Sequence, residues 1–373
     1  MCRISIMTIQ VGKPVTGQNL IGRDSELDLI GRMLDQGQSV VLVAPRRYGK
    51  TSVLLEALDR RKKQGDYTAF IDLFSIPDLM HLSAEIACCV MENKKIHFSL
   101  YQLQHGITEL MRNIQFRQEI DQYEYILGFG QKNYDEWALL KESLQLMESF
   151  AFRNKKRLIT FFDEFGDVKN LDGDRIVKLF RSELQVQQNT TCLFAGSYES
   201  VMNNIFVTKS APFYRFARII RLGRIDPETF RNHLLGIFVE QDIAGAEILS
   251  SRILTFTQGH PYYTSLMAQL AVIYRFNGTI HDLIEMALEA EGNYLEKSWS
   301  EISSKSQERA VIMAIVENSD TQLYQHLDHR KINVARVLKK LKETGFIETT
   351  TNGYRLTDPL LAWWIHQKVL KLP

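Results

Sequence analysis

One nine-residue segment constrains the fold more than any other feature of the sequence. Residues 44–52 read APRRYGKTS, follow the apolar run SVVLV and precede a helix-like run with leucines at positions 54, 55 and 58. A strand, a glycine-containing loop and a helix N-terminus in this order bind phosphate, because backbone N–H groups point at the anion and the helix dipole favours negative charge. The pattern is GxxxxGK[ST] with Ala44 in the first glycine position. It predicts a nucleotide-binding loop in an α/β fold.

The residues of this loop have distinct expected tasks. Gly49 lets the backbone pass close to the phosphates, Lys50 lies between the β- and γ-phosphates, and Thr51 ligates Mg²⁺. Ala44 would be unfavourable only if that position needs a positive φ. The alternative is a strand–helix turn with a chance lysine. The residues expected to contact the nucleotide are Ala44, Pro45, Arg46, Arg47, Tyr48, Gly49, Lys50, Thr51 and Ser52.

A second apolar run, LITFF, ends in the acidic pair Asp163-Glu164, which lies 163 − 50 = 113 residues after the loop lysine. Asp163 is expected to hold Mg²⁺, and Glu164 is expected to act as the general base that polarises the attacking water. A third run ends in Gly196-Ser197, and Ser197 is a candidate for orienting that water. The alternatives are that both polar groups simply end their strands.

The runs that predict strands are short, apolar and separated by helical material, which indicates a parallel sheet with helices on both faces. We expect strands at residues 39–43, 67–73, 158–162, 191–195 and 218–222. Residues 78–134 are expected to form a helical insertion. We expect a P-loop ATPase domain over residues 1–223, a helical domain over 224–295 that opens with Asp226-Pro227, and a C-terminal domain over 296–373; the resemblance described below implies that the helical domain is a lid. Three short helices and a hairpin around Asn352-Gly353 give that last domain the outline of a winged helix.

Composition excludes several classes of protein. The 373 residues carry 45 basic and 44 acidic side chains, so no global charge attracts the chain to nucleic acid or anionic lipid. No apolar run reaches the ~18 residues of a membrane span. The opening MCRISIMTIQVGKPV lacks the features of a secretory signal, and four cysteines form no disulfide framework. We therefore expect a cytoplasmic protein of two or three domains that does not bind membranes.

Five segments carry a resemblance to a known family: NLIGRDSEL, APRRYGKTS, SAPFYRFARIIRL, TQGHPYYTSLMAQL and the C-terminal VARVLKKLKETGFIETTTNGYRLTDPLLAWWI. Together they resemble the archaeal-type P-loop ATPases of the STAND branch, which are relatives of AAA+ proteins. The resemblance implies an AAA+/ASCE-type P-loop NTPase fold followed by a helical lid and a winged helix. It also implies ATP or ADP and Mg²⁺ as ligands.

The resemblance also implies roles for residues outside the loop. Ile21, Gly22 and Arg23 would flank the adenine, and His260 and Pro261, after Gly259, would bring the lid onto the nucleotide. Arg215 or Arg218 would act in trans as an arginine finger, which stabilises transferred charge from a neighbouring subunit. The alternatives are that both arginines are surface cations beside a strand and that His260 only begins a helix.

Residues 330–342 contain six basic side chains and no acidic one. Their cations fall largely opposite an apolar stripe at Val334, Val337, Leu338 and Leu341, as in a recognition helix. The alternatives are an ordinary solvated face and an intramolecular clamp on the nucleotide. The candidate DNA contacts are Lys331, Arg336, Lys339 and Lys340.

These patterns favour a slow Mg²⁺-dependent ATPase that acts as a molecular switch, with self-assembly or an unidentified protein partner. The alternative is a DNA-binding ATPase that resembles archaeal origin-recognition proteins and contacts DNA through the winged helix. A metabolic kinase is disfavoured because no segment after the loop resembles a site for an acceptor substrate.

Overall fold

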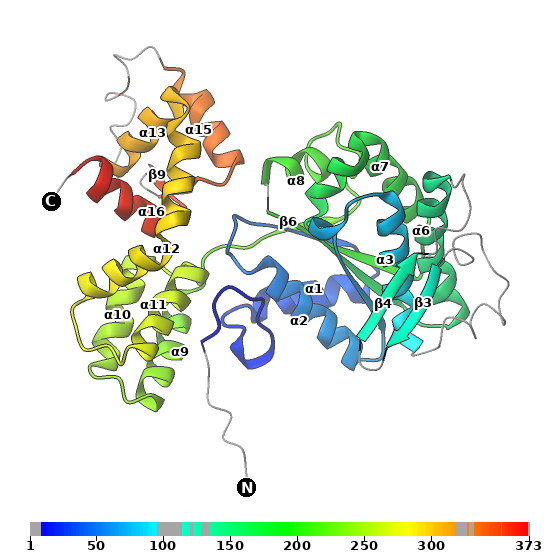
Figure 1. Cartoon of the computed structure of the whole chain (residues 1–373), viewed down its shortest axis with the longest axis horizontal. Helices are drawn as coiled ribbons and strands as arrows, with labels where there is room; N and C mark the ends of the chain where they lie inside the picture. Colours follow the sequence, from blue (N-terminus) through cyan, green and yellow to red (C-terminus); the bar gives the residue numbers. More distant parts are fainter. Residues whose placement is uncertain are drawn as a thin grey trace, which may run out of the picture.

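The computed structural model describes residues 9–94, 114–119, 122–127, 135–197, 199–317, 327, 332–351 and 353–371. Figure 1 shows an N-terminal lobe built around a sheet and a C-terminal lobe dominated by helices. A short linker after the last strand of the sheet connects the two lobes. None of the helices within these ranges combines the length and apolar character that crossing a membrane requires.

Five parallel strands form the sheet of the N-terminal lobe, in the order β2-β5-β6-β1-β7. The predicted parallel sheet is therefore confirmed, and each predicted strand overlaps an observed one. The chain returns to the middle of the sheet, so that β6 lies between the strand before the nucleotide loop and the strand before the acidic pair. The strands are β1 (Val40–Val43), β2 (Tyr67–Asp72), β5 (Leu158–Asp163), β6 (Thr190–Gly196) and β7 (Arg218–Arg221).

Helices bury both faces of this sheet. Val40 and Leu42 belong to the core beneath one pair of helices, and Val41 and Val43 belong to the core on the opposite face. Because successive strand residues point to opposite faces, burial on both sides requires the uninterrupted apolar runs seen in the sequence. One face is covered by α1 (Asp24–Asp35) and α2 (Lys50–Lys63), and the other by α3 (Leu79–Met91), α6 (Glu136–Arg153), α7 (Lys169–Leu184) and α8 (Glu199–Phe206).

The region 78–134 is not the wholly helical insertion that we predict. It begins with α3 and η3 (Glu92–Lys94), but β3 (Ile114–Glu119) and β4 (Gln122–Leu127) form an antiparallel pair. The sequences IQFRQE and QYEYIL contain apolar or aromatic residues at alternate positions, which is the period of a strand and not of a helix. Residues 95–113 lie outside the described ranges.

The C-terminal lobe begins at the predicted helix start. The Asp226 side chain accepts a hydrogen bond from the Thr229 N–H, and Pro227 occupies the first helical position. The sequence also predicts a break around residues 292–305, but most of this range is helix, since α12 continues to Ser303. The division at 296 therefore stays a prediction about domains. The helices of the predicted lid are α9 (Pro227–Glu240), α10 (Ala246–Thr257), α11 (Pro261–Ile273) and α12 (Ile280–Ser303).

The last part of the lobe contains helices and a two-stranded hairpin. Its described elements are α13 (Ser306–Glu317), α15 (Val334–Glu343), β8 (Ile347–Thr350), β9 (Gly353–Leu356), α16 (Pro359–Trp364) and η6 (Ile365–Val369). Another helix expected of a winged helix would fall within 318–331, where only Leu327 is described, so the winged helix stays a prediction. A single apolar core extends from Ile225 to Ile365, with Trp363 and Trp364 packed against it.

Candidate nucleotide-binding site

The phosphate-binding loop (residues 44–49) follows β1 at the carboxyl edge of the sheet. Gly49 has a φ of +83° and immediately precedes α2. A Cβ built on Gly49 would meet no protein atom within 4 Å, so the left-handed backbone, and not crowding, is the reason for glycine. Within the described part of the chain, no side chain caps the start of α2. Its first N–H groups therefore suit an anion.

Lys50 is buried, and its ammonium group stays within the loop. Its Nζ donates to the carbonyl oxygens of Ala44 at 3.0 Å and Pro45 at 3.1 Å. Ala44 does not adopt a positive φ, so alanine in the first glycine position causes no backbone strain. The loop therefore presents a buried cation next to the N-terminus of a helix.

Thr51 and Asp163 lie close enough to share a metal ion. The Thr51 Oγ1 donates to Asp163 Oδ2 at 2.7 Å, close to the roughly 2.9 Å between neighbouring ligands of an octahedral Mg²⁺ with bonds of 2.0–2.1 Å. Burial raises the pKa of the Asp163 carboxyl, while the hydrogen bond from Thr51 acts in the opposite direction. Both groups supply the oxygen ligands that Mg²⁺ prefers, so the residues fit this ion.

Glu164 pairs with Ser197, which follows the neighbouring strand β6. The Ser197 N–H donates to Glu164 Oε2 at 2.7 Å, and the Ser197 hydroxyl donates to Oε1. The structure thus brings together the two predicted polar groups that follow β5 and β6. Each carboxylate oxygen keeps a further lone pair with which to accept a proton.

The predicted adenine-flanking residues lie between the lobes. Ile21 packs against the core of the C-terminal lobe, and a Cβ on Gly22 would lie 2.6 Å from the Ile225 side chain. Arg23 is buried and donates to the carbonyl oxygens of Tyr48 at 3.2 Å and Gly223 at 2.7 Å. The Arg23 side chain therefore ties the phosphate-binding loop to the interlobe linker.

Tyr48 and Arg47 of the phosphate-binding loop point into the C-terminal lobe. Tyr48 is buried, and its ring lies edge-on to His260 at 4.9 Å between centroids. The Arg47 guanidinium donates to Tyr263 and Glu291. Arg46 is exposed, and Ser52 accepts a hydrogen bond from the Val15 N–H.

His260 lies at the predicted contact between lid and loop. Its Nδ1 accepts from the Tyr263 N–H at the start of α11, where Pro261 is the first helical residue. Burial lowers the pKa of His260 well below its ordinary value, and the Arg224 and Arg47 guanidiniums act in the same direction. The ring is therefore neutral at pH 7 and both caps a helix and supports Tyr48.

The backbone conformation and close packing at position 259, in the same GHP segment, require glycine. Its φ is +76°, and a Cβ at this position would lie 2.2 Å from the Ile225 carbonyl oxygen. The Gly259 carbonyl in turn accepts from the Ile225 N–H. Only glycine allows the lid to approach the linker this closely.

Two groups of predicted residues are not brought to this site. Arg215 and Arg218 are exposed, and Arg218 pairs with Val40 at the beginning of β1, whereas Lys50 follows its end. Arg336, Lys339 and Lys340 are exposed on α15, although Lys340 donates to Glu308 at 2.5 Å. Lys331 lies outside the described residues.

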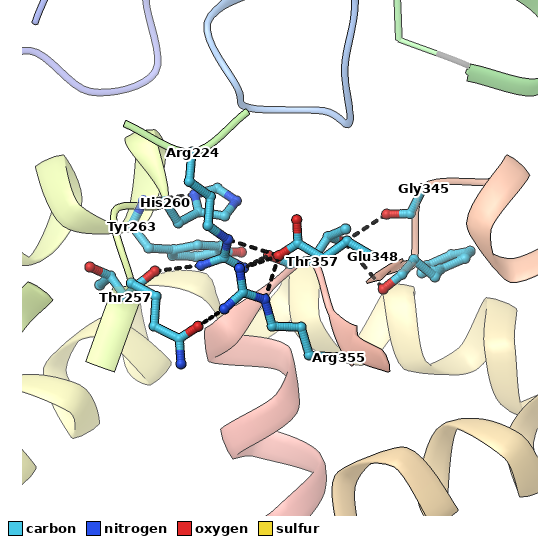
Figure 2. A network of polar contacts seen from close by, with 10 residues as sticks. Arg224, Thr257, His260, Tyr263, Gly345, Glu348, Arg355 and Thr357 are labelled. Atoms are coloured by element: carbon cyan, nitrogen blue, oxygen red, sulfur yellow. Dashed lines mark hydrogen bonds and ion pairs between the residues drawn. The ribbon is translucent and has the colours of Figure 1, made fainter. Parts of the chain in front are cut away.

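Sequence reasoning missed the polar network around Arg224, which Figure 2 shows between the linker, the lid and the C-terminal hairpin. Arg224 donates to Glu348 at 2.8 Å and to the carbonyl oxygens of Thr257 at 2.6 Å and Thr357 at 2.9 Å. Arg355 donates to the same Glu348 carboxylate. No local pattern marks Arg224, because its partners lie 33 to 133 residues away along the chain.

A family model described as an ATPase domain predominantly from Archaea matches residues 20–267. No curated protein matches the sequence. The chain is similar to the structure of the Walker-type ATPase PABY2304 of Pyrococcus abyssi, with 18% identity, a TM-score of 0.70 and coverage of 94% of this chain and 97% of that chain. It is also similar to the Aeropyrum pernix ORC2 protein in ADPNP–ADP complexes, with 14% identity, a TM-score of 0.53 and coverage of 95% and 98%. These structural likenesses confirm the α/β fold of the AAA+ type.

Proposed function

This chain belongs to the family of ATPase domains found predominantly in Archaea, and we propose that it is an Mg²⁺-dependent ATP-hydrolysing switch. Nucleotide state would set the arrangement of its two lobes. One observation supports the proposal: Lys50 contacts the phosphate-binding loop, Thr51 contacts Asp163 next to it, and the same loop contacts the C-terminal lobe. A switch needs a ligand site whose contacts differ between two arrangements of the molecule.

The side chains would divide the chemistry as follows. The N–H groups at the start of α2 would hold the β- and γ-phosphates, and Lys50 would balance part of their charge. Glu164 would accept a proton from the water that attacks the γ-phosphorus, and the bond to the bridging oxygen would break to leave ADP. Ser197 would fix the direction of the Glu164 carboxylate. Mg²⁺ held by Thr51 and Asp163 would supply positive charge at the phosphates.

Tyr48 and Pro45 of the loop are among the residues that would connect this site to the C-terminal lobe. The ring of Tyr48 lies against His260, and a Cβ built on Gly345, which precedes β8, would lie 3.8 Å from Pro45. Because both contacts are made by the phosphate-binding loop itself, a conformational change in the loop would directly alter its contacts with the lid and with the hairpin region. The output would be a change of arrangement and not a small-molecule product.

The proposal is tested with Lys50→Ala and Glu164→Gln. We expect Lys50→Ala to lose ATP binding in calorimetry, because it removes the buried cation of the loop. Glu164→Gln should bind ATP within about threefold of the parent but hydrolyse it ~10²–10⁴ times more slowly, because the amide cannot accept the proton. The control is Lys62→Ala, an exposed cation in the last turn of α2. Parent-like binding by Lys50→Ala would contradict the proposal.

A DNA-binding ATPase is the second candidate, and the exposed cations of α15 favour it. Arg336 and Lys339 are exposed on the face opposite the buried Val337, Leu338 and Leu341. Such a face is suited to phosphate contacts. In this alternative, DNA would be the partner whose binding the nucleotide controls.

A further inference from the structure

Arg47 leaves the phosphate-binding loop and enters a site in the C-terminal lobe. Its backbone has a φ of +67°, an uncommon conformation for a residue other than glycine, and its side chain is about three-quarters buried. The guanidinium donates to Glu291 at 2.6 Å and to the Tyr263 hydroxyl at 3.1 Å. It also lies 3.8 Å from the Tyr294 ring centroid and 4.2 Å from that of Tyr262. We call Tyr262, Tyr263, Glu291 and Tyr294 the Arg47 cage.

The cage is specific for a guanidinium. A planar cation can stack on aromatic rings while its N–H groups donate within the plane, whereas an ammonium group on a flexible stem cannot do both. Glu291 is buried, and it accepts from Tyr262 as well as from Arg47. The carboxylate therefore balances the charge of Arg47 inside a partly desolvated site, where such contacts are stronger than at an exposed surface.

The cage belongs to a body that extends to the end of the chain. Its residues come from α11 and α12, and the apolar core of these helices continues into α13, α15 and α16. The Tyr263 hydroxyl donates to Asp358 at the start of α16, so the ring next to Arg47 also contacts the C-terminal region. Arg224 donates to the Thr257 carbonyl of the lid and to Glu348 of the hairpin (Figure 2). The lid and the C-terminal region would therefore move together once Arg47 is released.

The contacts of Arg47 are separate from those that would hold phosphate. Its partners all lie in the C-terminal lobe, whereas Lys50 contacts carbonyl oxygens of the loop and Thr51 contacts Asp163. One loop therefore faces the nucleotide with one set of groups and the lid with another. The loop can therefore bind phosphate while its Arg47 side chain stays bound to the lid.

We propose that Arg47 is a latch, a positioning residue whose capture by the Arg47 cage keeps the C-terminal lobe closed over the nucleotide and slows nucleotide release. The inference rests on the proposed function, because it takes ATP and ADP as the ligands of the loop. Opening the lobes would require the guanidinium to leave both rings and the Glu291 carboxylate. The rate of ADP release would then be set by this contact and not by the phosphate contacts alone.

The test measures dissociation of a fluorescent N-methylanthraniloyl ADP, chased with excess unlabelled ADP in a stopped-flow instrument. We expect Arg47→Ala and Glu291→Ala each to accelerate release by about tenfold or more, since each removes one partner of a partly buried charged pair. The double variant should release ADP no more than about threefold faster than the faster single variant, because both changes remove one contact. Arg47→Lys should also accelerate release, and this milder change tests the latch even if Glu291→Ala fails to fold.

Two controls separate the latch from general loosening. Lys62→Ala removes an exposed cation in the last turn of α2 and should release ADP at the parent rate. Arg175→Ala removes a cation–π contact of 3.9 Å with Trp137, outside the C-terminal lobe, and should also behave like the parent. If the parent binds no ADP, the proposed function fails and the latch fails with it. If the parent binds ADP but Glu291→Ala and Arg47→Lys release it at the parent rate, the latch alone is overturned. Acceleration by Arg47 variants without any effect of Glu291→Ala would also overturn it.

Discussion

We expect pH to act on the contact between the lid and the C-terminal region through Asp358. Its Oδ1 caps α16 by accepting from the Leu361 N–H at 2.8 Å, and its Oδ2 accepts from the Tyr263 hydroxyl. Burial raises the pKa of the Asp358 carboxyl to about 6, although both hydrogen bonds favour the charged form. The folded protein therefore binds a proton at Asp358 more readily than the unfolded chain does.

The sign of the resulting pH dependence follows from linkage. Between about pH 4 and pH 6 the folded state holds more protons at Asp358, so this group's contribution to the free energy of unfolding falls as pH rises. Asp358→Asn should remove this fall while keeping a helix cap, because asparagine also caps helices. We expect the difference in free energy of unfolding, parent minus variant, to decrease by about 1–2 kcal/mol from pH 4.5 to 7, since one pKa unit corresponds to ~1.4 kcal/mol and Asp358 is only partly buried.

Urea titrations of both proteins at several pH values measure this difference. A difference that rises with pH over the same window would contradict the burial of the carboxyl group. Stability of both proteins would change with pH through other groups, but those contributions cancel in the subtraction.

Residue by residue, local pattern predicts only part of the candidate site. Lys50, Thr51 and the pair Asp163-Glu164 stand out because strand, loop and helix signals surround them in the sequence. The direction of the Arg47 side chain cannot be predicted in this way, because its partner Glu291 lies 244 residues away and the backbone of Arg47 is left-handed. The pairing of Glu164 with Ser197 is predictable from the sequence, since Ser197 also follows a predicted strand and the carboxyl ends of parallel strands lie at one edge of the sheet.

At the scale of elements, burial decides which predictions succeed. The three central strands β1, β5 and β6 are evident because both of their faces are buried, which demands apolar runs, whereas the edge strands β2 and β7 are only partly buried. The hairpin of β3 and β4 is missed because its alternating pattern lies in a long stretch between helices. The continuation of α12 past Gly292 is missed because glycine lowers helix propensity by only ~1 kcal/mol, which packing against the core can offset.

The proposed role of α15 in DNA binding can be tested directly. Lys340 pairs with Glu308, which is buried, so a carboxylate at position 340 would meet another and disturb the fold. Arg336 and Lys339 are the better positions to change. We expect Arg336→Glu with Lys339→Glu to reduce the slope of log K for DNA against log salt by about 2, since each phosphate contact contributes ~0.9.

DNA titrations at several salt concentrations measure that slope. The matched control is Lys62→Glu with Lys178→Glu, which changes the net charge equally on exposed residues outside α15. ATPase activity without DNA should stay at the parent value in both double variants. An unchanged slope in the α15 variant would assign its cations to an ordinary solvated face.

For the whole molecule, the parallel sheet separates two groups of predicted functional residues. Lys50 and Glu164 follow the ends of β1 and β5, whereas Arg218 is the first residue of β7. Three steps along a strand, at ~3.3 Å each, already separate Arg218 from the edge where the loop begins. Arg215 lies further back along the chain and is also exposed. Neither arginine is placed to serve the site of its own chain, so a role in hydrolysis requires a second copy.

A mixing experiment tests whether such a copy is used. We expect the double variant Arg215→Ala with Arg218→Ala to hydrolyse ATP at least tenfold more slowly than the parent, since arginine fingers typically contribute ~10³–10⁵. The Lys50→Ala protein keeps both arginines but lacks a working loop. Mixing the two inactive proteins should restore hydrolysis, because the arginines of one copy would then face the intact site of the other, and the specific activity of the parent should rise with protein concentration. Parent-like activity of the double variant, or a mixture as inactive as its components, would leave Arg215 and Arg218 as surface cations and the hydrolytic site as the work of a single chain.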